Sequence, residues 1–415
     1  MTILFVFGGL ILLLLTGMLI FAALGLTATA ILLFFEGHIG PISDTGMAHL
    51  SKPVLMTIPL FVFMAQIMIK AKVIDDLYDM ANPVIGHIRG GRGVATVLSC
   101  TIFAAISGSS VATALSIGSS VIPQMKRYGY PEREALGVIA AGGTLGILIP
   151  PSGPMNLCAI FSDASIGALF LAGILPGLML AVMFSIYCMW KGGTREQTSW
   201  AGWGAVMLAL RKSIWAVLTP PIIMGGIYAG VFTASEAAAG CLYALLVAAL
   251  AYRTLTPRMI RDCAYATMRT SMMVFMIIAG AAMFGHAITI IRLPVGVTEG
   301  VAALGLSLLA FILVVMALIF VMGMFFDSIA IILITTPILL PTMHALDIDL
   351  VWYGVLLTIN LELAMITPLV GLNLFVIKGI TDAPGVPQPP TGLMTDLRAR
   401  RTALAKPPHV TGCLG

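Results

Sequence analysis

The chain has 415 residues, of which 59% are hydrophobic and only 10% are charged, and its formal net charge is +4. Ordinary soluble domains carry about 25% charged residues, so this composition excludes a soluble globular protein. Continuous apolar runs of about 20 residues predict membrane-spanning helices. These runs lack the strict alternation of a β-barrel strand. The chain contains no GxxxxGK[ST] or HExxH motif, which argues against an ATPase or a zinc protease.

The N-terminal part, residues 1–70, is predicted to form scaffold spans. Its first apolar run, residues 3–35, has no basic residue before it and is too long for the apolar core of a signal peptide, so we interpret it as a retained span. Residues 71–92 mix charged and apolar side chains. This pattern predicts an amphipathic arm along the cytoplasmic interface.

Residues 93–162 are predicted to form a helical hairpin followed by a broken helix. Two short apolar legs, residues 93–106 and 111–125, flank the polar tip at residues 107–110. Basic residues stand before the first leg and after the second. Because each leg is short for a full span, we expect a re-entrant hairpin that enters from the cytoplasm. Two short spans packed through a Gly/Ser seam are the alternative.

The helix expected after this hairpin, from Glu132 to Phe161, is interrupted by prolines. The interruption reads Pro150-Pro151-Ser152-Gly153-Pro154. Proline removes a backbone donor and clashes with the preceding turn. The carbonyl groups freed in this way need an ion, a hydroxyl group or water as partner at membrane depth.

The middle of the chain is predicted to return to scaffold spans. Residues 163–253 form these spans around a basic cytoplasmic loop at 191–212, and residues 254–303 form a second amphipathic arm, over 254–270, and a span. In this topology only Lys52 and Arg292 of the 22 Lys and Arg residues lie outside, as the positive-inside rule requires. We therefore expect a multi-pass membrane protein with both termini in the cytoplasm.

Residues 304–380 are predicted to repeat the hairpin and the broken helix. The legs cover 304–324 and 328–343, and Asp327 and Ser328 lie at the tip. Acidic residues flank this hairpin, so we expect it to enter from outside. The helix from residue 352 to 377 is interrupted at residues 367–371, and the tail at 381–415 is predicted to be disordered.

The two hairpin units are related by an offset of 218 positions. The aligned pairs include Ser110 with Ser328, Pro123 with Pro341, Pro150 with Pro368, and Gly153 with Gly371. Related units with basic and acidic flanks are what inverted-topology repeats require. Paired, interrupted hydrophobic segments in two halves predict a secondary transporter and not an enzyme. The fold class predicted is an all-α polytopic membrane protein.

Helix ends at membrane depth suit ion and anion binding. The free N–H groups that begin the second half-helices suit a carboxylate, and the carbonyl groups that end the first half-helices suit Na⁺. Two acids, Asp327 and Glu362, lie at membrane depth, where carboxylates are costly and default to functional hypotheses. Cation coordination, proton coupling and a neutral structural carboxyl group all remain open for them.

Several segments resemble the large membrane subunit of TRAP (tripartite ATP-independent periplasmic) transporters. The segments are 58–61, 106–112, 144–155, 335–341, 360–362, 367–368 and 371–375. They occur in the family's order over residues 10–380. The chain departs from the family pattern at three places. The family usually has a second proline at the position of Leu369, often a glycine at the position of Ala364, and a proline near residues 18–21 that this chain lacks.

The resemblance implies an elevator-type transporter that imports an organic acid, such as a C4-dicarboxylate or sialic acid, in symport with Na⁺. It implies a periplasmic substrate-binding protein and a small four-helix membrane subunit as partners, with no cofactor beyond the coupling ion and no nucleic acid. It assigns Na⁺ binding to Ser107, Ser109, Gly146 and Pro151 on the inner side and to Asp327 and Thr367 on the outer side. Candidate substrate, tip and helix-break residues are Gly108, Ser110, Pro150, Ser152, Gly153, Pro154, Ser328, Glu362, Pro368, Gly371 and Asn373.

Three other readings compete with this one. The first is a stand-alone Na⁺- or H⁺-coupled symporter or antiporter of a related inverted-repeat family. The second is a channel with two re-entrant loops, which is disfavoured because the sequence lacks a tetramer-type filter motif. The third is an intramembrane hydrolase, which is disfavoured because no paired acids or Ser/His arrangement lies at membrane depth.

Overall fold

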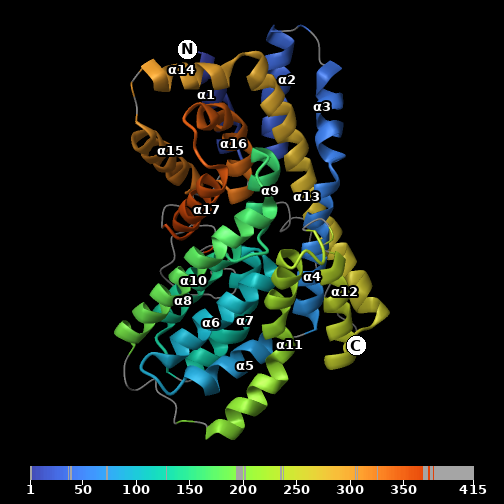
Figure 1. The fold of residues 1–415 in the computed structure, drawn as a ribbon, viewed down its shortest axis with the longest axis vertical. Coiled ribbons are helices and arrows are strands. Elements are labelled where there is room, and N and C mark those ends of the chain that lie inside the picture. Colours follow the sequence, from blue (N-terminus) through green and yellow to red (C-terminus); the bar gives the residue numbers. More distant parts are fainter. Residues whose placement is uncertain are drawn as a thin grey trace, which may run out of the picture.

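Every regular element in the described part of the chain is a helix in the computed structural model (Figure 1). The structure describes residues 2–367 except 36, 38–39, 72, 128, 193–199, 201, 234–235, 237, 304, 306 and 325, and beyond residue 367 it describes Asn373 and Ile377. The predicted all-α fold is confirmed. The predicted residues Pro368 and Gly371 and the tail at 381–415 lie outside the described residues.

The helices follow one another through short connections. In the N-terminal half they are α1 (Thr2–Leu15), α2 (Ile20–Phe35), α3 (Gly40–Leu50), α4 (Thr57–Lys70), α5 (Val73–Ile85), α6 (Gly91–Ser107), α7 (Ser110–Arg127), α8 (Glu132–Leu148), α9 (Gly153–Ser162) and α10 (Ile166–Lys191). In the C-terminal half they are α11 (Gly202–Tyr228), α12 (Ala238–Leu246), α13 (Pro257–Ile290), α14 (Leu293–Ala303), α15 (Leu308–Gly323), α16 (Ser328–Ala345) and α17 (Leu350–Ile366).

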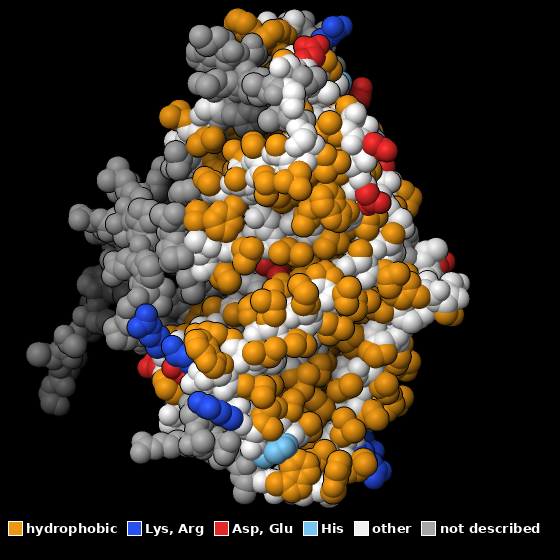
Figure 2. Space-filling view, turned by 60° about the vertical axis from the view of Figure 1, so that its left-hand side comes forward, with side chains coloured by type: hydrophobic (Ala, Val, Ile, Leu, Met, Phe, Trp, Pro, Cys, Tyr) orange, Lys and Arg blue, Asp and Glu red, His pale blue; other side chains and the backbone are white. Residues whose placement is uncertain are grey.

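Six helical segments in the described residues are long and apolar enough to cross a membrane. They are Pro53–Lys70, Glu132–Ser162, Ile166–Lys191, Gly202–Tyr228, Pro257–Ile290 and Ser328–Ala345. Figure 2 shows that hydrophobic side chains cover most of the middle of one face, while Lys and Arg side chains lie mostly in its lower part. This surface is the one expected of a multi-pass membrane protein.

The two hairpins occupy opposite halves of the molecule. Figure 1 shows α6 and α7 in the lower half and α15 and α16 in the upper half, with α9 and α17 between them. The long helix α13 packs against α2, α3 and α4 on the other side of the molecule, and it also contacts α16. The hairpins and broken helices therefore stand beside a separate group of helices built around α13.

The hairpin and the broken helix predicted in the N-terminal half of the chain, from its glycine, serine and proline residues, both form where expected. The hairpin consists of α6 and α7, and the broken helix consists of α8 and α9 separated by a four-residue break. The second hairpin is formed by α15 and α16, and its tip includes Asp327. The second break begins where α17 ends, at Ile366, and its further course lies outside the described residues.

Four other elements differ from the sequence-based expectation. The arm expected at residues 254–270 continues directly into the span as α13, because no proline or glycine lies between Arg258 and Ala279 to end the helix. The first apolar run is divided at residues 16–19 into α1 and α2. The loop expected at 191–212 is helical from Gly202 onward. Helix α10, expected in the scaffold, packs against α6, α8, α9 and α17.

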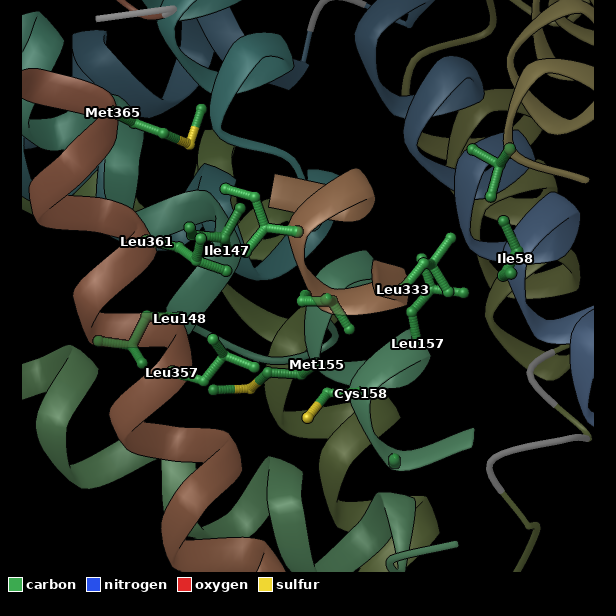
Figure 3. Packing of buried hydrophobic residues seen from close by; sticks show 14 of the residues in the cluster. Ile58, Ile147, Leu148, Met155, Leu157, Cys158, Leu333, Leu357, Leu361 and Met365 are labelled. Carbon is green, nitrogen blue, oxygen red and sulfur yellow. The ribbon is translucent and has the colours of Figure 1, made fainter. Parts of the chain in front are cut away.

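The broken helices share one hydrophobic core (Figure 3). Leu357 and Leu361 of α17 face Leu148 and Met155, which stand on the two sides of the first break, and all four side chains are buried. Leu157 of α9 lies beside Leu333 of α16 and Ile58 of α4. Close packing of this kind transmits small displacements between elements, so the two halves of the chain are mechanically joined at the breaks.

Candidate functional site

The tip of the first hairpin is a two-residue reversal between α6 and α7. Helix α6 ends at Ser107, and Gly108 follows in the left-handed conformation with φ +59°. The Gly108 N–H group donates to the Ala104 carbonyl oxygen at 2.9 Å. Glycine ends helices in this way because it has no Cβ to clash. Helix α7 then begins at Ser110, so both helix ends face the break in the next helix.

The hairpin tip sits directly on the break between α8 and α9. The Gly153 N–H group donates to the Gly108 carbonyl oxygen at 3.2 Å. A Cβ atom on Gly108 would collide with the Pro151 carbonyl oxygen, and one on Gly146 would lie 2.5 Å from the Ser109 carbonyl oxygen. The structure therefore brings Ser109, Gly146 and Pro151 to one place.

Hydroxyl groups hold the backbone of this tip. The Ser107 and Thr113 hydroxyl oxygens lie 2.8 Å apart, and the Thr113 hydroxyl donates to the Ser109 carbonyl oxygen at 2.9 Å. The Ser109 hydroxyl accepts from the Ala112 N–H group at 3.4 Å and so caps α7. The tip therefore offers several neutral oxygen atoms within a short stretch of chain, the donor type that hard cations prefer.

Ser152 bridges the two half-helices of the first break. Its hydroxyl donates to the Ile147 carbonyl oxygen at 2.5 Å and accepts from the Met155 N–H group at 3.4 Å. The side chain thus satisfies one carbonyl group left free by α8 and one N–H group left free by α9. This explains locally why a serine stands among the three prolines of the break.

The tip of the second hairpin is capped by an acid. Asp327 precedes α16, and its Oδ2 atom accepts from the Ile329 N–H group at 3.2 Å. A carboxylate at a helix N-terminus is favoured by the helix dipole. The following Ser328 is buried. Asp327 therefore places a carboxyl group at the tip of the second hairpin, where the first hairpin has serines.

Both hairpin tips line one cavity of about 140 Å³. Residues 107–111 and Pro151 line it from the first half, and Asp327 and Ser328 line it from the second. A single water needs only about 10–15 Å³ of such space. The opposite wall comes from α4 and α13, through Ile58, Phe61, Val62, Thr270 and Val274. The cavity thus lies between the paired hairpins and the helices built around α13.

One polar contact joins the first hairpin to Asn373, which follows the second predicted break in the sequence. The Ser110 hydroxyl donates to the Asn373 Oδ1 atom at 3.3 Å, and the Asn373 side chain is buried. Two predicted site residues that are 263 positions apart in the sequence therefore meet.

Two predicted residues lie apart from the cavity. Thr367 directly follows α17, and its hydroxyl donates to the Leu363 carbonyl oxygen at 2.6 Å. The described lining of the cavity does not include Thr367. Glu362 is buried on α17 outside that lining, and neither of its carboxyl oxygens has a hydrogen-bond partner among the described residues. Among the described residues, no contact therefore joins Asp327 to Thr367, the two residues predicted to bind the outer Na⁺.

Sequence reasoning missed three polar residues of the site. Thr113 holds the first tip, Thr270 lines the cavity from α13, and the Asn156 side-chain amide donates to the Thr57 hydroxyl at 2.5 Å. Asn156 and Thr57 join α9 to α4, so their bond crosses from the broken helix to the opposite wall. A lone amide in the apolar run after the prolines was the signal that could have pointed to Asn156.

The comparisons with known proteins agree with this architecture. Residues 7–397 match the family model of the "Tripartite ATP-independent periplasmic transporter, DctM component". The C4-dicarboxylate TRAP transporter large permease protein of Pseudomonas aeruginosa is 39% identical over 369 residues, which cover 87% of this chain and 86% of that protein. The ectoine TRAP transporter large permease protein of Halomonas elongata is 36% identical over 343 residues, covering 81% and 80% respectively.

A solved structure shares the fold at low sequence identity. The crystal structure of the YdaH transporter of Alcanivorax borkumensis aligns with a TM-score of 0.60 at 12% identity, covering 88% of this chain and 84% of the other. The family match and the permease relatives define the class of protein as a transporter permease, in agreement with the paired helical hairpins. The chain belongs to the DctM family, the large permease component of TRAP transporters.

Proposed function

We propose that this permease imports a small organic acid carrying a carboxylate and draws the energy from the Na⁺ gradient. The observation that supports this most is the cavity shared by the two hairpin tips, which combines neutral oxygen atoms, helix N-termini capped by serine hydroxyls, and one acid. The proposed substrate is a C4-dicarboxylate, sialic acid or a similar carboxylate. The P. aeruginosa relative is named for C4-dicarboxylates and the H. elongata relative for ectoine.

The inner Na⁺ is proposed to bind where the first tip meets the first break. Ser107, Ser109, Gly146 and Pro151 contribute hydroxyl and carbonyl oxygens to that place. Na⁺ accepts neutral oxygen ligands, and helix C-termini present such oxygens with a negative dipole end. An outer Na⁺ is proposed at Asp327 and Thr367, which would have to approach one another during the transport cycle.

The substrate carboxylate is proposed to bind at the N-termini of α7 and α9, two helices in the N-terminal half of the chain. These helix ends are capped by the neutral hydroxyls of Ser109 and Ser152, so their positive dipole ends remain uncompensated by charge. At α16 the carboxylate of Asp327 already occupies the corresponding position. The helix N-termini of the first half are therefore open to the substrate carboxylate, while the carboxyl group at the second tip suits a cation.

The transport motion is proposed to be an elevator movement of the hairpins and broken helices against the helices around α13. The cavity lies at that boundary, and the Asn156–Thr57 bond is one contact that such a movement would break. A small four-helix membrane subunit and a periplasmic binding protein are the proposed partners, and the bacterial cytoplasmic membrane with both termini inside is the proposed location. A stand-alone symporter or antiporter is the competing proposal.

Uptake into proteoliposomes separates these proposals. The permease, its small membrane subunit and the periplasmic binding protein would be supplied with labelled succinate, sialic acid or ectoine, with and without an inward Na⁺ gradient. We expect one of these acids to accumulate only when both the Na⁺ gradient and the binding protein are present. Accumulation that is equal with and without the Na⁺ gradient, or equal with and without the binding protein, contradicts the proposal. A proton gradient in place of Na⁺ serves as the matched control.

A further inference from the structure

A second cavity lies between α6, α8 and α10, away from the hairpin tips. Its volume is about 440 Å³, and it is lined by residues of those three helices and by Tyr130. Val97, Val138 and Phe184 form an apolar part, whereas Arg133 and Lys191 lie at the ends of α8 and α10. No residue of this cavity belongs to the transport site described above.

The charged end of this cavity carries basic side chains that can bind an anion. Arg133 and Lys191 are exposed, and no ion pair joins either of them to a described residue. Their neighbour Lys126 differs, because its ammonium group lies 2.5 Å from the Glu132 carboxylate. The half-buried Glu134 also lines the cavity, so the three charges leave one excess positive charge. A ligand with one negative charge matches this lining best.

Aromatic residues place this end of the cavity at a membrane interface. Tyr187 lines the cavity, and its ring centroid lies 6.5 Å from that of Trp190, whose side chain is exposed. Tyr and Trp gather where the polar headgroups meet the hydrocarbon, and Lys and Arg just beyond them mark the cytoplasmic side. Lys191 directly follows this pair of aromatic residues.

The apolar end extends from that interface toward the bilayer core. Ala141 lies eight residues beyond Arg133 on α8, and Phe184 lies seven residues before Lys191 on α10. At 1.5 Å per residue, both helices carry the cavity roughly 10–12 Å inward from its charged end. This depth suits part of an acyl chain below a charged headgroup.

We propose that this cavity binds one anionic phospholipid with a hydroxylated headgroup, of the phosphatidylglycerol class. The phosphate lies between Arg133 and Lys191, a headgroup hydroxyl donates to the Glu134 carboxylate, and the first part of an acyl chain lies along Val138 and Phe184. Basic recesses between helices on the cytoplasmic side are a recognised setting for anionic headgroups. The proposal rests on the membrane orientation proposed above and not on the choice of transported acid.

Native mass spectrometry of the purified permease tests the proposal with defined lipids. Phosphatidylglycerol and phosphatidylcholine of identical acyl chains would be added in detergent, to the unmodified chain and to two variants. Arg133→Gln with Lys191→Gln removes the charges, and Gly137→Leu fills the cavity from α8, where an added Cβ meets open space. We expect both variants to retain at least fivefold less phosphatidylglycerol than the unmodified chain, which itself prefers phosphatidylglycerol over phosphatidylcholine.

Matched variants elsewhere provide the controls. Arg258→Gln with Arg261→Gln removes two exposed arginines of α13, and Gly225→Leu adds a side chain to α11 in open space. Both should keep the lipid retention of the unmodified chain. Equal retention of the two lipids, or unchanged retention in the Arg133/Lys191 and Gly137 variants, overturns the proposal. Displacement of the lipid by millimolar inorganic phosphate alone would also overturn it, because the site would then bind a free anion.

Discussion

Replacing Gly146 with alanine should reduce organic acid uptake at least about tenfold while leaving the permease folded in the membrane. The new Cβ would lie 2.5 Å from the Ser109 carbonyl oxygen and 2.8 Å from the Ser110 nitrogen. Those atoms are backbone, so the hairpin tip must move away from the break. Displacements of about 1 Å in a site that positions reacting or binding groups can cost about 100-fold. Uptake by proteoliposomes with equal amounts of inserted protein is the measurement.

Gly137→Ala is the control for this substitution. It lies on the same helix, and its added Cβ would meet nothing within 4 Å. Alanine in a helix interior is otherwise about 0.5–1 kcal/mol more favourable than glycine, so neither change should weaken α8 itself. Equal uptake by the Gly146 and Gly137 variants would show that the contact between tip and break does not matter for transport.

The combined change Ser107→Ala and Ser109→Ala should raise the Na⁺ concentration for half-maximal uptake about tenfold or more. Each hydroxyl that contacts a charged group contributes roughly 1.5–3 kcal/mol, and about 1.4 kcal/mol corresponds to tenfold in affinity. The backbone of the tip should remain in place, because Thr113 still donates to the Ser109 carbonyl oxygen. Uptake measured across a series of Na⁺ concentrations gives this value directly.

Two other serines of α7 make a matched control. Ser116 and Ser119 lie away from the described cavity lining, and the Ser119 hydroxyl donates to the Ser116 carbonyl oxygen. Their double alanine variant should keep the Na⁺ dependence of the unmodified chain. If the Ser107/Ser109 variant also keeps it, the inner Na⁺ assignment is wrong, whatever happens to the maximal rate.

The sequence alone was sufficient for the parts of the fold that depend on local backbone chemistry. Gly108 ends α6, Ser110 begins α7, and the residues from Ile149 to Ser152 separate α8 from α9. These residues control dihedral angles and hydrogen bonding within a few positions, so their effect is visible in the sequence itself. The same reasoning located Asp327 at the second tip.

Features that depend on packing between distant segments were harder to predict. The charge pattern of residues 254–270 resembled a surface arm, yet from Pro257 onward these residues continue into the span as part of one 34-residue helix. Helix α10 has the composition of any span, and only its neighbours place it with the hairpin and broken helices. Asn156 and Thr270 look like isolated polar residues until the folded chain brings both to the cavity.

The two units of the internal repeat differ in the side chain that caps the helix after each hairpin tip. Ser109 and Asp327 occupy equivalent positions in the two units, and both cap the helix that follows. One cap is neutral and the other is acidic, so the units share backbone shape but differ in charge. An alignment of the two halves therefore predicts where each tip lies, but it does not predict the chemical type of the side chain that caps the following helix.

Alkylation of a cysteine in the cavity tests the central claim that substrate and Na⁺ share the space between the tips. Val111→Cys lines the cavity, and Leu115→Cys lies one turn further on α7 with an exposed side chain. The five described native cysteines are buried, and the unmodified chain supplies the background rate. The transported acid with Na⁺ should slow reaction of Val111→Cys with a maleimide at least fivefold and leave Leu115→Cys unchanged. Equal rates with Na⁺ and with choline would contradict the account.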